Sequence, residues 1–110
     1  MTMLNKPTRV YLSGAMSGMP DLNFPLFNKV AAQLRGLGWD VVNPVDINGD
    51  PSARWIDCII ADLRHVEKCD AIALLPGWEK SFGAQIEHLT AQKLGLAVYN
   101  AADLVQMEAA

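Results

Sequence analysis

One short stretch of the chain decides the fold, Asp70-Ala71-Ile72-Ala73-Leu74-Leu75. Everything after its first residue is apolar. A strand with one face in water alternates apolar and polar residues, whereas a strand covered on both faces is a continuous apolar run. We therefore interpret residues 70–75 as a central strand of a parallel sheet that has helices on both sides.

The rest of the chain alternates β-prone runs with segments in which apolar residues recur at helical spacing. The predicted strands are 9–13, 39–43, 70–75 and 96–99, and the predicted helices are 23–37, 53–68, 84–94 and a terminal 102–108. Polar or small-residue loops are expected at 13–20, 45–52 and 76–83. The order βαβαβαβ predicts an α/β fold of three layers, doubly wound and flavodoxin-like or Rossmann-like. We expect a four- or five-stranded, mainly parallel sheet in a single domain over residues 1–110.

Composition excludes several classes of protein. The chain has 110 residues, 51% of them hydrophobic and 19% charged, which is too apolar for a disordered protein. Its formal charge is −3, and its nine Lys and Arg residues form no run, so binding to duplex nucleic acid is not expected. The longest apolar stretches are about five residues, and the amino terminus lacks the apolar centre of a signal peptide. We expect a cytoplasmic protein with no membrane partner.

Neither the cysteines nor the known cofactor motifs predict a bound metal or cofactor. Cys58 and Cys69 show no CxxC or Cys/His ligand spacing, and we interpret both as reduced, partly buried residues. The sequence contains no GxGxxG, GxxxxGKS or HExxH pattern. We therefore expect neither a cofactor nor a metal.

Chemically active residues gather at one edge of the predicted sheet. Ligands of doubly wound folds bind at the carboxyl ends of the strands, which here carry the loops 13–20 and 76–83. The residues expected there are Tyr11, Ser17, Asp62, Ser81 and Glu87. Each also has an ordinary explanation, since the two acids could be solvated helix residues. Ser81 could be only a helix N-cap, although a helix N-terminus also attracts phosphate.

Four segments of the chain carry a resemblance to a known family. Val10–Gly14, Ala61–Leu63, Cys69–Leu74 and Ser81–Glu87 resemble, in order and approximate spacing, the signatures of nucleoside 2-deoxyribosyltransferases over about residues 9–99. The chain also resembles a group of short phage and prophage proteins. Those proteins carry a YLSGxMSGxPxxN start, a CDAIxLLPGW strand end and an SxGAxxE helix.

The resemblance assigns catalytic roles to three residues. It implies that Glu87 is the nucleophile on the anomeric carbon, that Asp62 exchanges a proton with the base, and that the Tyr11 hydroxyl orients Glu87. Cleavage of an N-glycosidic bond passes through an oxocarbenium-like state, which requires one ionised carboxylate and one protonated acid. Asp62 then needs a raised pKa, which apolar Trp55 and Leu63 nearby would favour.

Ser81 bears on the choice of substrate. The transferases that use free nucleosides carry an acidic residue six positions before the catalytic glutamate, where this chain has Ser81. A serine there resembles the 2′-deoxynucleoside 5′-phosphate N-hydrolases, in which it binds the phosphate. Those hydrolases have serine and arginine where this chain has Ala15 and Ser17. The groups that would have to compensate are Ser13, Ser17, Lys80 and the backbone amides of residues 14–18.

We therefore expect cleavage or base exchange on a 2′-deoxynucleoside 5′-monophosphate, or on a deoxynucleoside, through a covalent deoxyribosyl-enzyme. The alternative is a non-catalytic nucleotide-binding or sensing module, and a flavodoxin-like binding protein is less favoured. A homodimer or higher homo-oligomer is expected, because related enzymes complete their sites with a neighbouring subunit. The expected substrate-binding residues are Ser13, Gly14, Ala15, Met16, Ser17, Gly18, Asn23, Gly77, Trp78, Ser81 and Gly83.

Overall fold

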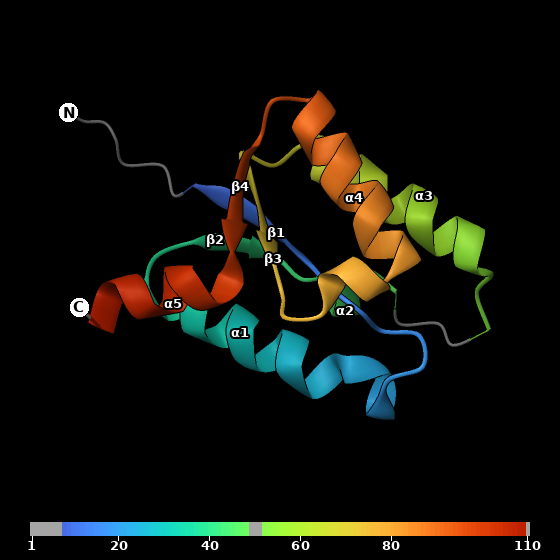
Figure 1. The fold of residues 1–110 in the computed structure, drawn as a ribbon, viewed down its shortest axis with the longest axis horizontal. Coiled ribbons are helices and arrows are strands. Elements are labelled where there is room, and N and C mark those ends of the chain that lie inside the picture. Colours follow the sequence, from blue (N-terminus) through green and yellow to red (C-terminus); the bar gives the residue numbers. More distant parts are fainter. Residues whose placement is uncertain (1–7, 49–51, 110) are drawn as a thin grey trace.

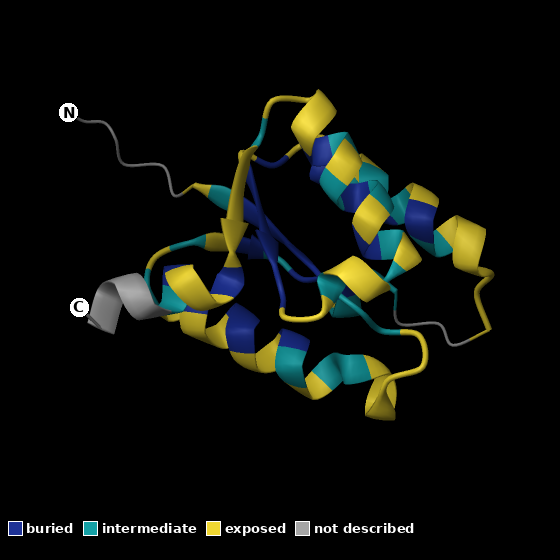
Figure 2. Ribbon diagram, viewed as in Figure 1, coloured by how far each residue is buried: buried dark blue, intermediate teal, exposed yellow. Residues whose placement is uncertain are grey.

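The computed structural model describes residues 8–48 and 52–109 (Figure 1). Its strands form one sheet in the order β2-β1-β3-β4, and every neighbouring pair is parallel. The strands are β1 (Arg9–Ser13), β2 (Asp40–Val42), β3 (Ala71–Leu74) and β4 (Ala97–Asn100). β3 is buried along its whole length, whereas β4 at the edge is exposed (Figure 2). The prediction of a parallel sheet with a buried central strand is confirmed.

Helices cover both faces of this sheet. The α-helices are α1 (Phe24–Gly36), α2 (Pro44–Ile47), α3 (Trp55–Val66), α4 (Phe82–Lys93) and α5 (Ala101–Ala109). Two 3₁₀ turns, η1 (Pro20–Asn23) and η2 (Trp78–Lys80), lie in the connections. α1 and α5 lie on one face and α3 and α4 on the other, which confirms the three-layer α/β fold (Figure 1). Among the described helices, none is both long and apolar enough to cross a bilayer.

Two connections differ from the predictions. The expected loop at 45–52 begins with α2, because Pro44 occupies its first turn and the Asn43 side chain accepts the N–H of Val45 at 3.2 Å. Residues 49–51 of that loop lie outside the described residues. The helix expected at 84–94 starts at Phe82, since Ser81 caps it.

The alternation of side chains along β1 divides the core in two. Val10 and Leu12 pack toward α1 and α5, whereas Tyr11 belongs to the cluster on the α3 and α4 side. Successive residues of a strand point to opposite faces, so Ser13 faces the same side as Tyr11. The two hydroxyl side chains of β1 therefore point toward α3 and α4.

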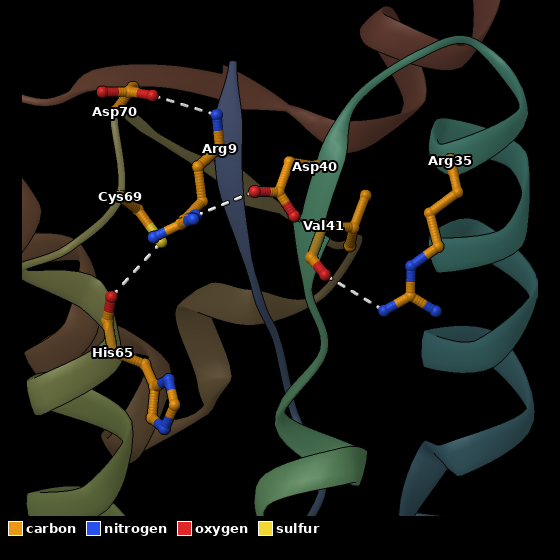
Figure 3. A network of polar contacts seen from close by, with 7 residues as sticks. All are labelled: Arg9, Arg35, Asp40, Val41, His65, Cys69 and Asp70. Carbon is orange, nitrogen blue, oxygen red and sulfur yellow. Dashed lines mark hydrogen bonds and ion pairs between the residues drawn. The ribbon is translucent and has the colours of Figure 1, made fainter. Parts of the chain in front are cut away.

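The amino ends of the strands carry a separate polar network (Figure 3). Arg9 donates from Nε to Asp40 Oδ2 at 2.9 Å, and its backbone N–H donates to Asp70 Oδ2 at 3.0 Å. Cys69 donates from Sγ to the His65 carbonyl at 3.3 Å. The Arg9–Asp40 pair is exposed and contributes little free energy. This network lies at the end of the sheet opposite the expected ligand edge.

Candidate active site

Glu87 lies on the buried face of α4. The helix begins at Ser81, whose Oγ accepts the N–H of Ala84 at 3.2 Å. Counting from this cap, Ala84, Glu87 and Ala91 are the buried positions. The Glu87 side chain is only 5% exposed. A carboxyl group in such a place needs polar partners to offset its desolvation.

β1 supplies two hydroxyl donors for this carboxyl group. The Tyr11 hydroxyl donates to Glu87 Oε2 at 2.8 Å, and the Ser13 hydroxyl donates to Oε1 at 2.6 Å. Both donors are fully buried. With one donor on each oxygen, the carboxylate has a fixed orientation, and hydrogen bonds to an ionised group are the stronger kind. The structure therefore places Ser13 among the residues that hold Glu87.

Asp62 occupies the buried face of α3, together with Ile59 and Val66. It is 6% exposed, and its Oδ1 accepts a hydrogen bond from Nδ2 of Asn48 at 2.8 Å. Because α3 packs against α4, Asp62 and Glu87 come close enough for each to affect the pKa of the other.

Burial dominates the protonation of this carboxyl pair. It raises the pKa of Glu87 to about 8, and the charge of Asp62 raises it too, although the hydroxyls of Ser13 and Tyr11 act in the opposite direction. Burial also raises the pKa of Asp62, against the hydrogen bond from Asn48. The pKa of Tyr11 lies well above its ordinary value, first through burial and then through the two carboxylates, so Tyr11 remains a neutral donor. Burial and mutual repulsion therefore favour a state in which the two acids share one proton.

A cavity of about 340 Å³ opens beside the two acids. Its size falls within the usual range of small-molecule sites, and most of its lining is apolar with a few polar groups. Of the residues predicted from the sequence, those that line it are Gly14, Met16, Ser17, Asp62, Ser81, Gly83 and Glu87.

The other predicted substrate-binding residues are not among the described residues of the cavity lining. Tyr11 and Ser13 act through Glu87. Asn23 donates from Nδ2 to the Ala15 carbonyl at 3.0 Å, which fixes the loop after β1. Trp78 packs against the His88 ring, with the ring centroids 4.6 Å apart. The remaining members, Ala15, Gly18 and Gly77, are likewise not among the described lining residues.

Two glycines in the cavity wall permit close approach of neighbouring segments. A Cβ atom at Gly14 would lie 2.9 Å from the Leu75 Cβ atom, and one at Gly83 would lie 3.0 Å from Ile59 Cδ1. The first contact joins the carboxyl ends of β1 and β3, and the second brings the start of α4 onto α3. Glycine is therefore required for packing at position 14, whereas at position 83 a side chain would need the flexible end of Ile59 to shift.

Several residues of the cavity wall could not be predicted from the sequence. Asn48, Trp55, Cys58 and Ile59 all line the cavity. Trp55 was expected only as an apolar neighbour of Asp62, yet it is exposed and stacks on Phe82 with ring centroids 5.9 Å apart. Asn48 reaches Asp62 only through the packing of α2 on α3, for which the sequence holds no signal.

Comparisons with known proteins agree with this fold. Residues 8–100 match the sequence model of a family described as "Domain of unknown function (DUF4406)". A solved structure described as a "2-desoxiribosyltransferase from Leishmania mexicana" superimposes with a TM-score of 0.65 at 23% identity. The alignment covers 84% of this chain and 62% of that chain, so this chain spans less than two thirds of its length. No curated protein matches the sequence.

Proposed function

The chain belongs to the DUF4406 family of domains of unknown function, and we propose that it cleaves or exchanges the base of a small 2′-deoxynucleoside or its 5′-monophosphate. The observation that carries the proposal is the pair of buried carboxyls, Glu87 and Asp62, in the wall of one cavity. Two adjacent buried acids cost stability, and a fold of this kind does not need them. Strongly perturbed acids in a cavity are typical of catalytic sites.

In the proposed reaction, a Glu87 oxygen forms a bond to C1′ of the sugar while the bond from C1′ to the base breaks. The electron pair of that bond leaves with the base, which receives the Asp62 proton. In the second half, water or another base attacks C1′ and releases Glu87, and the attacking group returns its proton to Asp62. Hydrolysis and base exchange therefore differ only in the second nucleophile.

The two acids take different roles in this scheme. Glu87 must be ionised, and the hydroxyls of Tyr11 and Ser13 stabilise that charge. The shared proton must then lie on Asp62. A positively polarised sugar beside Glu87 and a basic ring nitrogen beside Asp62 both favour that distribution.

Ser81 supports a phosphate on the substrate. Its oxygen accepts from the Ala84 amide, which leaves its O–H free to donate to a ligand, and it lines the cavity together with Ser17. The N-terminus of α4 adds a favourable dipole for an anion. Among the described lining residues there is no Lys or Arg. The Ser81 hydroxyl and the N-terminus of α4 would therefore provide the favourable contacts. We expect kcat/KM to favour the monophosphate by about 10- to 100-fold, the scale of a hydrogen bond to a charged group.

The first experiment is incubation of the purified protein with deoxynucleosides and their 5′-monophosphates, with and without a second free base. Chromatography would detect the released base or the new nucleoside. Glu87→Ala should slow base release by about 10³-fold or more, since it removes the nucleophile. The matched control is Glu67→Ala at the exposed end of α3, which should keep wild-type activity. Activity of Glu87→Ala within tenfold of wild type would contradict the assignment.

A second experiment tests the phosphate. Ser81→Asp keeps a good N-cap, but it places a carboxylate against the phosphate and offers a 5′-hydroxyl an acceptor. The wild type should therefore have the higher kcat/KM for the monophosphate, and the variant should have the higher kcat/KM for the nucleoside. A ratio that does not change would show that Ser81 is only a helix cap.

We also propose that a second copy of the chain covers the mouth of the cavity. Apolar side chains are exposed on α3 and α4 beside it, where Phe82 is 69% exposed and Trp55, Ile56 and Ile60 about half exposed. Contiguous exposed apolar surface is typical of protein interfaces. Light scattering during gel filtration should show a dimer or larger species, and Ile60→Glu should reduce it to a monomer. A monomeric wild type would contradict this part of the proposal.

A further inference from the structure

Among the described residues, the Asn48 carboxamide is held on one side only. Asn48 ends α2, where its backbone N–H donates to the Pro44 carbonyl at 2.9 Å. Its Nδ2 donates to Asp62 Oδ1 at 2.8 Å. Its Oδ1 has no hydrogen-bond partner among the described residues, and Asn48 lines the cavity. One half of the amide therefore contacts Asp62, while the described part of the chain leaves the other half without a partner at the cavity.

This contact fixes the direction of the amide and the site of the Asp62 proton. As long as Asp62 Oδ1 carries no proton, a turned amide would place its own oxygen against a second acceptor. Because Oδ1 already accepts from Asn48, a proton on Asp62 lies on Oδ2. With that proton in place, as the proposed reaction requires, the two residues form an O–H donor beside a C=O acceptor.

We propose that Asn48 and Asp62 together select a base whose ring-nitrogen acceptor lies next to an exocyclic amino group. This inference rests on the proposed function. The ring nitrogen accepts the Asp62 proton, and the amino group donates to the Asn48 oxygen. An asparagine side chain pairs with the edge of adenine through the same kind of atoms. A purine with an oxo group at position 6 in place of the amino group would set a second acceptor against the Asn48 oxygen. Binding of such a base is therefore disfavoured.

The test compares two substrates that differ at this edge, 2′-deoxyadenosine 5′-monophosphate and 2′-deoxyinosine 5′-monophosphate. The wild-type protein should prefer the amino base in kcat/KM by about 10- to 100-fold. In Asn48→Leu, which is similar in size but has no polar atoms, the preference should fall to within about threefold. Both values come from one preparation, so partial unfolding lowers both and leaves the ratio unchanged.

A matched control changes another residue of the same cavity. Ser17→Ala should slow both substrates equally, because Ser17 lies in the loop after β1 and in the proposed function serves the phosphate, which both substrates carry. If Asn48→Leu yields no folded protein, Asn48→Ser is measured in its place, and its ratio should collapse in the same way. Equal wild-type values, or a preference that persists in the Asn48 variant, would overturn the inference.

Binding separates this inference from the proposed reaction. If neither nucleotide releases its base, both are titrated as intact ligands by calorimetry. Selective binding of the amino base that is lost in the Asn48 variant would support the inference while contradicting the proposed catalysis. Binding of neither nucleotide, or equal binding of both, would overturn the inference.

Discussion

Replacing Glu87 with glutamine is expected to stabilise the protein by an amount that increases with pH. Burial in the ligand-free site raises the pKa of Glu87 from its ordinary 4.5 to about 8. Between these two values the folded protein holds a proton that the unfolded chain has lost. The stability contributed by this group is therefore complete below about pH 4.5 and is lost as the pH rises through about 8. Glutamine cannot ionise, so the variant avoids this loss.

The magnitude follows from the size of the shift. One pKa unit corresponds to about 1.36 kcal/mol, so the wild-type protein loses about 2 kcal/mol of unfolding free energy by pH 6 and about 4 kcal/mol by pH 8 from this group. A domain of this kind has a total stability of about 5–15 kcal/mol, so the effect is large enough to measure. A changed hydrogen bond to Tyr11 or Ser13 in the variant adds an offset that varies little with pH, because neither hydroxyl titrates in this range.

Urea unfolding of the wild type and of Glu87→Gln between pH 5 and pH 8 measures this difference. The advantage of the variant should grow by about 3 kcal/mol across that interval. Glu67→Gln is the control, because Glu67 is exposed and its replacement should show no comparable trend.

A difference that stays flat between pH 5 and pH 8 would refute this reasoning. It would mean that Glu87 is already ionised in the ligand-free site, with the hydroxyls of Tyr11 and Ser13 cancelling the effect of burial. The proposed nucleophile would then be charged before any substrate enters, and no proton would need to move to Asp62 when the ligand binds.

Two further predictions concern β1. Gly14→Ala places a Cβ atom 2.9 Å from that of Leu75, which should cost about 1–3 kcal/mol of stability in thermal denaturation. Gly36→Ala is the control, since nothing lies within 4 Å of its Cβ position. Tyr11→Phe removes one of the two donors to the proposed nucleophile, so kcat should fall about 10- to 100-fold with little change in KM, as measured by steady-state kinetics.

Most of the fold could be predicted because its signals are local. The apolar run at 70–75 identifies β3 without reference to distant residues, and helical spacing locates α1, α3 and α4 to within a few residues. α2 was missed because Pro44 was taken to break a strand and begin a loop, although a proline also fits the first turn of a helix. A one-turn helix has too few residues to show a period.

The candidate site was less accessible to sequence reasoning. From spacing alone, Glu87 and Asp62 could both be solvated helix residues, and it was the family resemblance that singled them out. The contact of Ser13 with Glu87 did leave a signal, because Tyr11 and Ser13 are two residues apart on one strand and must face the same side. The contact of Asn48 with Asp62 depends on how α2 packs against α3, which only the three-dimensional structure shows.

Both buried acids are held by neutral donors from outside their own helices. Glu87 receives two hydroxyl donors from β1, and Asp62 receives one amide donor from the end of α2. In the ligand-free site these donors do not overcome burial, which keeps the pKa of Glu87 near 8. In the proposed reaction, positive charge on the sugar and a basic ring nitrogen would move the shared proton to Asp62. A ligand that supplies only one of these two groups would move it less, so the site would become reactive only with sugar and base both in place.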